Sequence, residues 1–177
     1  MTIDRLQQEL IGEIKGLAQD MFLVNRKGER AAMRGYAQAV PVVPLFANVP
    51  LSQEGDGQEF PEEPDLFPYF IVRVDGVEYQ KKREDESFFN QAHVMIAFAV
   101  YDEDLGMRGY FSLNTVMERV VMRFQENPVL GPFFCERRMN TAYQEDDTFP
   151  QFFGAIEMTW NLPEISVARS QREMEDF

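Results

Sequence analysis

The stretch from Gln91 to Phe124 constrains the fold of this 177-residue chain more than any other part of it. Residues 91–101 form an apolar run that is rich in β-favouring side chains and too short to span a membrane, so we predict a strand buried on most of its surface. Residues 113–124 place apolar side chains at the i, i+3, i+4, i+7 spacing of a helix with one apolar face. A long strand followed by a helix that packs back on its sheet indicates an α/β or α+β core.

The flanking segments supply further elements. Residues 3–22 show helical spacing of apolar side chains, which predicts a second amphipathic helix. Asp75-Gly76 is typical of a tight turn after a strand, and a polar acidic turn is expected at residues 140–148. The expected strands are residues 67–74, a short return strand at 77–79, residues 133–139 and residues 152–162, with room for one short edge strand in residues 40–49. The predicted fold class is α+β, an α/β sandwich whose mixed or mainly antiparallel sheet is flanked by two main helices, with long loops.

We expect a single domain over residues 1–165 and a charged C-terminal tail over 166–177, since a chain of this length can bury one core without staples. Residues 40–66 form a long proline-rich acidic loop in this interpretation. Six acids and no base lie between Ser52 and Asp65. A long loop in a compact domain is often functional, because it can reach a neighbour that the core cannot reach.

Composition limits the classes of function. The chain has 17 Lys and Arg against 30 Asp and Glu, a net charge of −13, which argues against an ordinary nucleic-acid binder. The negative excess lies in residues 51–177, and a solvated surface is its simplest explanation. The single cysteine allows no intramolecular disulfide, and the N-terminus does not resemble a signal peptide, so we expect a soluble protein made in a reducing cytoplasm. Sixteen Phe and ten Met indicate either a Phe-rich core or apolar surface for partner subunits.

The residues that could carry chemistry do not form a recognisable motif. The acids at 102–104 and at 145–147 could bind a cation or act as an acid/base pair, but consecutive residues of a strand point in alternating directions. His93 has no second histidine to join, and Cys135 is expected to be a small buried residue. Phosphate-binding loops and the HExxH, GxSxG and paired CxxC patterns do not occur. We therefore predict no catalytic, cofactor or metal site, and an assembly or binding protein is the leading class.

Arg26, Lys27 and Arg30 follow the first predicted helix. Cations favour the negative end of the helix dipole, which explains these bases as a helix terminus and a solvated turn. The alternative is a small basic contact for an acidic partner or a phosphate.

An ordered set of short motifs resembles the tail terminator, or tail-completion, proteins of long-tailed bacteriophages and prophages. The resemblance covers roughly residues 67–165, and it lies in the order and spacing of the motifs because each one is chemically ordinary. The motifs are Phe67-Pro68-Tyr69 with Val72-Arg73, Tyr101-Asp102-Glu103-Asp104, Met117-Glu118-Arg119-Val120, Phe149-Pro150-Gln151-Phe152-Phe153-Gly154, Met158-Thr159-Trp160 and Leu162-Pro163. The chain departs from the family pattern in a longer loop between Val74 and Gln91 and a longer proline-rich stretch before Phe67.

The resemblance implies a non-enzymatic virion protein of the tail or neck, made in the host bacterial cytoplasm. Such a protein forms a homohexameric ring at the head-proximal end of the tail tube, stops tube polymerisation and joins the tail to the head. The implied partners are other copies of the chain, the major tail tube protein and a neck or head-completion protein, with no membrane. The alternatives are a related head–tail connector, or a small acidic binding or adaptor module outside a virion that could mimic nucleic acid.

A ring gives the predicted surfaces specific roles. A ring needs head-to-tail contacts that close on themselves, and an acidic lumen would let DNA pass without specific binding by repelling its phosphates. We expect the subunit or partner interface to involve the loops at 40–66 and 75–90. The interface candidates are Arg26, Lys27, Arg30, Phe46, Phe60, Lys81 and Lys82, and the candidate channel-facing acids are Glu59, Glu62, Asp102 and Asp104.

Overall fold

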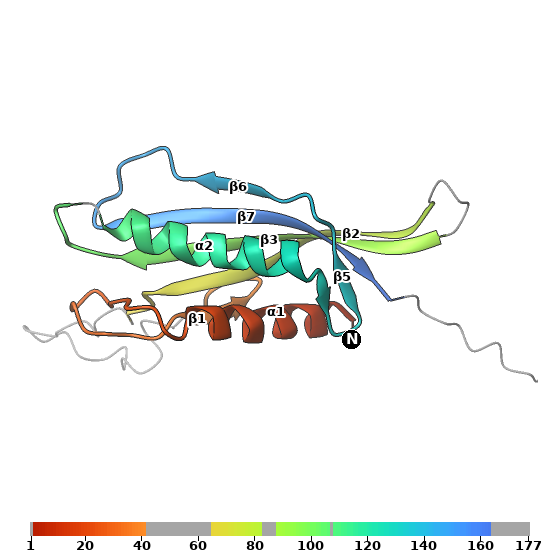
Figure 1. Ribbon diagram of the computed structural model, residues 1–177, viewed down its shortest axis with the longest axis horizontal. Helices are drawn as coiled ribbons and strands as arrows, with labels where there is room; N and C mark the ends of the chain where they lie inside the picture. The colour runs from red at the N-terminus through yellow and green to blue at the C-terminus, as the bar shows by residue number, and fades with distance from the viewer. Residues whose placement is uncertain (1, 42–64, 83–87, 107, 164–177) are drawn as a thin grey trace, which may run out of the picture.

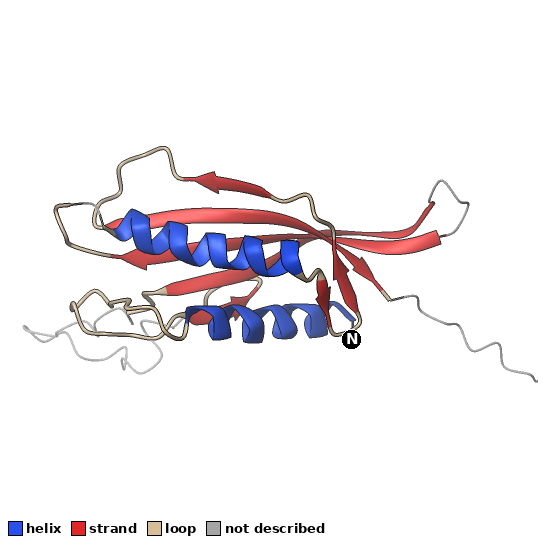
Figure 2. Cartoon of the chain, in the orientation of Figure 1, coloured by secondary structure: helices blue, strands red, loops and turns tan. Residues whose placement is uncertain are grey.

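Two helices cover one face of a mixed β-sheet, and the opposite face of the sheet carries no helix in the described part of the chain (Figures 1 and 2). The structure is a computed structural model that describes residues 2–41, 65–82, 88–106 and 108–163. Helix α1 is Thr2–Ala18 and helix α2 is Gly109–Glu126. This arrangement confirms the predicted α+β fold class.

The sheet has the strand order β1-β2-β3-β7-β5-β4, and β6 pairs with β7. β1 is parallel to β2 and every other pairing is antiparallel. The strands are β1 (Arg34–Ala37), β2 (Tyr69–Lys82), β3 (Phe88–Tyr101), β4 (Val129–Leu130), β5 (Phe133–Cys135), β6 (Asn140–Tyr143) and β7 (Gln151–Leu162). The strand predicted at 91–101 is confirmed as part of the longer β3, which lies at the centre of the sheet between β2 and β7.

The core lies between the helices and the sheet. Alternate residues of β3 and β7 point toward the helices and are buried, as the pleat requires. In β7 the exposure pattern alternates over the whole strand, with every second residue buried. Trp160 is completely buried and packs edge-to-face on Phe124 of α2, with 5.1 Å between the ring centroids. The largest fully buried side chains are Trp160, Phe70, Phe98, Phe124, Phe133 and Phe152.

Two glycines allow the helices to approach the sheet closely. A Cβ at Gly109, the first residue of α2, would lie 2.2 Å from the Phe152 ring, and one at Gly35 in β1 would lie 2.5 Å from the Phe70 ring. The absent side chains therefore let these aromatic rings pack directly against backbone.

Ion pairs connect α2 with α1 and with the turn that follows α1. Arg123 of α2 pairs with Glu13 of α1, and both side chains are largely buried. One turn earlier in α2, Arg119 pairs with Asp20 and also donates to the carbonyl oxygen of Leu17 at 2.7 Å. The hydrogen bond from Arg119 holds the pKa of Asp20 below its ordinary value.

The tight turn predicted at Asp75-Gly76 is wrong. β2 continues through this point to Lys82, and Val74 pairs with Val94 while Gly76 pairs with the next residue, His93, so Asp75 is the extra residue of a β-bulge. Asp75-Gly76 favours a turn locally, but the backbone pairing of β2 with the long strand β3 continues on both sides of it. The segment 75–90 is thus mostly strand rather than loop in the described residues.

Several boundaries also differ from the predictions. α1 ends at Ala18 instead of residue 22, with backbone turns from Gly16 onward. α2 begins at Gly109 instead of residue 113 and ends at Glu126, two residues beyond the predicted end at 124 and before Pro128. The strand predicted at 133–139 stops at Cys135. The segment 140–148, expected to be a turn, begins with β6, whose four residues are all exposed and which is held by its ladder to β7. An edge strand of this kind is stabilised by backbone hydrogen bonds to its neighbour, so its sequence does not have to alternate between apolar and polar residues.

Candidate functional site

An aromatic cluster on the open face of the sheet brings together residues that are distant in the sequence. Its members are Phe67, Tyr69, Tyr101, Phe153 and, at its border, Tyr36. The Phe67 ring is central: its centroid lies 5.3 Å from Tyr69, 5.9 Å from Tyr101 and 6.3 Å from Phe153. Three of the short motifs that resemble tail terminators, those beginning at residues 67, 101 and 149, thus meet at one end of the sheet.

Strand register creates this cluster. Tyr69 pairs with Ala99 of β3, and Ala99 pairs with Phe153 of β7, so these three residues lie side by side and point to the same face. The backbone N–H of Asp102 then donates to the carbonyl oxygen of Pro150 at 3.0 Å, which ties the end of β3 to the start of β7. The motifs alone did not predict that these rings would touch, because the register that aligns them depends on pairings between distant strands.

Arg26 lies beside this cluster. Its guanidinium carbon is 5.2 Å from the Phe67 ring centroid, and its backbone N–H donates to the carboxylate of Asp65 at 2.7 Å. The loop that carries it is anchored by bridges from Val24 to Arg30 and to Tyr101. The loop is therefore held against the end of β3, and Arg26 has a specific position rather than that of a solvated helix terminus.

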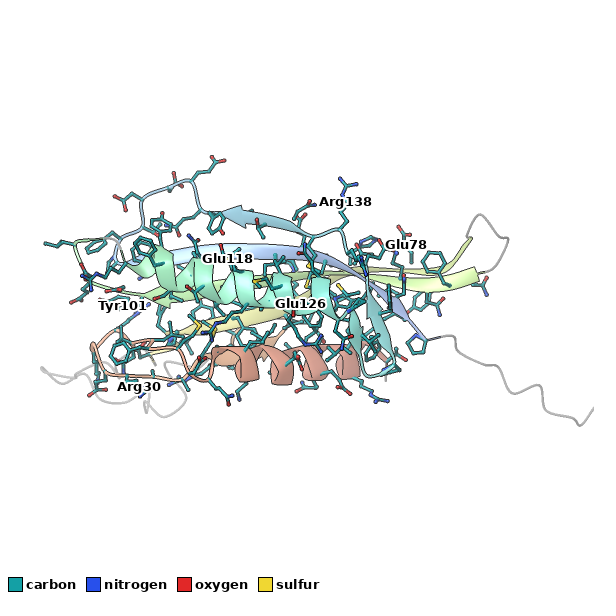
Figure 3. The ribbon with its side chains drawn as sticks, viewed as in Figure 1. Arg30, Glu78, Tyr101, Glu118, Glu126 and Arg138 are labelled. Atoms are coloured by element: carbon teal, nitrogen blue, oxygen red, sulfur yellow. The ribbon has the colours of Figure 1, made fainter. Side chains whose placement is uncertain are left out.

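The other two predicted bases of this loop are also exposed. Arg30 is labelled in Figure 3. Its guanidinium carbon lies 5.9 Å from the centroid of the Phe22 ring, and Phe22 is an exposed residue that no sequence pattern singled out. The backbone N–H of Lys27 donates to the side-chain oxygen of Asn25 at 2.9 Å. The interface role of Arg26, Lys27 and Arg30 stays a prediction.

The tyrosine hydroxyls respond to this environment. Tyr101 donates to Glu103 Oε1 at 2.5 Å, and that hydrogen bond raises the pKa of Tyr101. Burial raises the pKa of Tyr69. Both hydroxyls therefore stay protonated at neutral pH, and that of Tyr101 acts as a hydrogen-bond donor at the end of the open face.

The acids predicted to face a channel shape a turn. Asp102 Oδ1 accepts from the N–H of Asp104 at 2.9 Å, and Asp104 Oδ1 accepts from the N–H of Gly106 at 2.7 Å. Asp104 also pairs with Arg108 at 3.1 Å. These carboxylates organise the link from β3 into α2, and the channel-facing role of Asp102 and Asp104 stays a prediction.

The remaining predicted site residues lie in other places. Phe46, Glu59, Phe60 and Glu62 lie outside the described residues, as does most of the predicted loop at 40–66. Lys81 and Lys82 belong to the end of β2, which corrects their expected position in a loop. The structure does not bring them to the aromatic cluster, because β2 runs away from that end of the sheet (Figure 1).

A polar hollow of about 440 Å³ lies on the same open face, toward the opposite end of the strands from the aromatic cluster. Gln91, which is buried, donates to Glu136 Oε1 at 2.5 Å and to Asn161 at 3.2 Å. His93 Nε2 is 3.6 Å from Glu78 Oε1, and both side chains are about half exposed. The charged lining residues are Asp75, Glu136, Arg138 and Glu157. Three of these residues are acids and one is a base, so the lining carries both signs of charge with an excess of acids.

Metal binding and thiol chemistry have no assembled site in the described ranges. No group of three or more His, Cys, Asp or Glu residues there is arranged to hold a metal ion. Cys135 is buried as predicted, and burial raises its pKa to about 12, so its thiol is a poor nucleophile. Neither described helix is long and apolar enough to cross a membrane.

Comparison with protein-family models and with curated proteins finds no match to this chain. The fold and surfaces define the chain as a two-layer α+β domain whose distinctive feature is an open, partly apolar sheet face with an aromatic cluster at one end.

Proposed function

We propose that the chain is a structural virion protein, a tail terminator that forms a hexameric ring at the head-proximal end of a phage tail tube. In this role it stops tube polymerisation and joins the tail to the neck. Its function is assembly rather than catalysis, and it uses no cofactor. Its partners are other copies of itself, the tail tube protein and a neck protein.

The observation that carries the proposal is the aromatic cluster. The motifs that resemble the terminator family are short, and their order along the chain was the basis of the resemblance. In the fold, the residues Phe67, Tyr101 and Phe153 from three of those motifs are in ring contact. Residues that share a structural location can share a role, which supports the view that the motifs belong to one functional unit.

The open sheet face supports an assembly role. Ile71, Met95, Ala97 and Ala155 project from it and are only partly buried, next to the half-buried ring of Phe153. A sheet that is apolar on both faces is usually covered on both. A neighbouring protein in the tail would provide that cover.

The charge of the chain fits a ring through which DNA passes. A net charge of −13 repels phosphates and disfavours binding of the passing duplex. Asp102 and Asp104 remain the described candidates for channel-facing acids.

The test is deletion of the gene in the phage or prophage that encodes the chain, followed by electron microscopy of the lysate. We expect filled heads without tails, together with tail tubes of irregular and excessive length. Supplying the wild-type chain from a plasmid should restore normal virions. A matched pair of complementing variants is Tyr101→Ala, in the aromatic cluster, and Tyr143→Ala, an exposed residue of β6 outside it. Tyr101→Ala should restore fewer virions than Tyr143→Ala.

Two results contradict the proposal. Normal virions after deletion would remove any role in tail assembly. Tails of normal length that fail to join heads would assign the chain to a neck protein that acts after the tube has been terminated.

A further inference from the structure

The two ends of α2 carry exposed apolar residues, with a group of exposed acids beside one end and, beside the other, two exposed arginines among acids. We infer that these ends are complementary docking surfaces, through which one copy of the chain binds the next head-to-tail. The inference rests on the ring in the proposed function, and it identifies the surfaces that form the contact. The acidic end surface is Leu105, Phe111 and Phe149 with Glu103, Glu145, Asp146 and Asp147. The basic end surface is Val129, Phe134, Arg137 and Arg138.

The acidic end surface has three apolar side chains that are unusually exposed. Leu105 is 88% exposed, Phe111 is 70% exposed and Phe149 is 38% exposed. Neighbouring contacts hold them at one end of the molecule. The Phe149 ring lies 6.4 Å from that of Phe152, which packs 4.7 Å from Tyr110, the residue before Phe111.

The charges around these apolar residues are mostly negative. Glu103, Glu145, Asp146 and Asp147 are all exposed, from the β3–α2 link and from the loop before β7. The nearby base, Arg108, is paired with Asp104. The N–H of Phe149 donates to Asp147 Oδ1 at 3.0 Å, which positions the ring beside its acidic neighbours.

The basic end surface lies where the chain leaves the other end of α2. Val129 and Phe134 face each other across the β4–β5 ladder and are 48% and 44% exposed. Arg137 and Arg138 follow β5, are exposed, and form no ion pair within the described ranges. Figure 3 shows Arg138 extending outward from the link between β5 and β6.

The carboxylates beside these arginines already accept hydrogen bonds. Glu136 accepts from Gln91 at 2.5 Å, and Glu157 accepts from Asn140 at 3.4 Å. Each carboxylate can accept further hydrogen bonds, but neither forms an ion pair with Arg137 or Arg138 in the described ranges. The two guanidinium groups are therefore open to acids of another molecule, and the nearby Val129 and Phe134 provide apolar contact area.

A single copy cannot bring its two surfaces together. α2 has 18 residues, so its ends are separated by about 27 Å at 1.5 Å per residue. The two surfaces differ, so the contact between copies is heterologous, and it closes into a ring if the rotation between subunits allows. Apolar groups meet apolar groups and acids meet arginines, which is the complementarity that fixes partner and register in specific interfaces. A second copy covers one of these surfaces with its own opposite surface, and a copy on each side covers both.

Two variants, each altered at one end only, test the inference. Leu105→Ser/Phe111→Ser alters the acidic end, and Arg137→Glu/Arg138→Glu alters the basic end. All four side chains are exposed, so both variants should keep the far-ultraviolet circular dichroism and the Trp160 fluorescence of the wild type. Sedimentation velocity and native mass spectrometry of the full chain should show concentration-dependent association of the wild type. Each variant alone should associate at least about tenfold more weakly.

Mixing the variants gives the decisive result. Each variant retains one intact end, so an equimolar mixture should form a 1:1 dimer and no larger species. A third variant, Glu145→Arg/Asp146→Arg, should form species larger than a dimer when it is mixed with the Arg137→Glu/Arg138→Glu chain. The intact ends of the two chains meet in one contact, and the reversed charges allow the second contact that the first mixture lacks. Controls are Met122→Ser, an exposed apolar change in the middle of α2, and Lys15→Glu, an exposed charge reversal on α1; both should associate like the wild type.

Three outcomes would overturn the inference. The wild type could stay monomeric at its highest soluble concentration, or the single-end variants could associate like the wild type. The third outcome is an equimolar mixture of the two single-end variants that grows beyond dimers. Hexamers that persist in both variants would show that a ring forms through other surfaces. The proposed function fails separately, by normal virions after gene deletion, so the two results can be distinguished.

Discussion

The two faces of the sheet are built from the same strands and have different environments. On the face toward the helices, Phe152, Ile156 and Trp160 of β7 are buried. On the open face, the intervening residues Phe153 and Ala155 are only partly buried although they are also apolar. The helices, and not the local sequence of the strand, produce this difference. The covered face forms the core, and the open face leaves apolar area partly exposed to solvent.

A matched pair of substitutions in β7 tests this division most strongly. Phe152→Ala removes a ring from the covered face and should lower the free energy of unfolding by about 3–5 kcal/mol. Phe153→Ala, one residue later, should cost about 1 kcal/mol, because its ring is already partly in solvent. Urea unfolding followed by Trp160 fluorescence measures both values. Equal costs would mean that the open face is as much a part of the core as the covered face.

A second pair compares a buried glycine that faces the sheet, Gly109 of α2, with an exposed glycine, Gly12 of α1. Gly109→Ala would place a Cβ 2.2 Å from the Phe152 ring and should destabilise the fold by about 1–3 kcal/mol. Gly12→Ala, on α1, meets no atom within 4 Å and should stabilise it by about 0.5–1 kcal/mol through helix propensity. Thermal denaturation of the two variants should shift in opposite directions. A shift in the same direction would contradict the close approach of α2 to the sheet.

The ion pair between the helices gives a smaller effect. Arg123→Ala removes the pair with Glu13 and the hydrogen bond to the carbonyl oxygen of Asn127 at 2.5 Å. The pair is only partly accessible to solvent, so we expect a loss of about 1–2 kcal/mol. Arg5→Ala is the control, because its pair with Glu9 is exposed and within one helix. A similar loss in both variants would argue that Arg123 contributes nothing specific to the packing of the helices.

The smallest expected effect depends on pH. The hydrogen bond from Arg119 lowers the pKa of Asp20 in the folded state below the ordinary value of 3.8, which we take for the unfolded state. The Asp20 carboxylate therefore stabilises the fold at pH values above the unfolded pKa. This stabilisation is lost as the pH falls through the lower folded pKa. Asp20→Asn should therefore be less stable than the wild type at pH 7, and the difference should shrink below about pH 4. Denaturant unfolding at several pH values measures it. A difference that is constant from pH 7 to pH 2 would exclude this linkage.

The elements with strong apolar periodicity could be predicted from the sequence. Both helices, the central strand and the last strand lie where the patterns placed them, apart from their ends. β1 and β6 were missed because each has four residues without an apolar pattern and is held by pairing with a longer strand. From the apolar run 91–101 we predicted a strand that is buried on most of its surface. The run is apolar on both faces of the strand, so its pattern could not show that the helices would pack on only one of them.

The candidate surfaces were less predictable than the fold. The sequence identified the motifs at residues 67, 101 and 149, but contact between Phe67 and Phe153 depends on the register of three strands. Phe111 and Leu105 have an ordinary apolar character in the sequence. Phe111 is exposed because the face of α2 that packs on the sheet does not include it, and Leu105 is exposed because it lies in the link before α2. Both positions depend on tertiary packing, which the local sequence does not determine.

The buried thiol of Cys135 makes this chain convenient for labelling experiments. Its raised pKa and complete burial should keep it unreactive toward maleimide dyes in the folded protein. A cysteine introduced at an exposed position therefore becomes the one reactive thiol of the native chain. A donor dye at one end of α2 and an acceptor dye on another copy at the opposite end would report, by energy transfer, the distance between neighbouring subunits and the order in which they join.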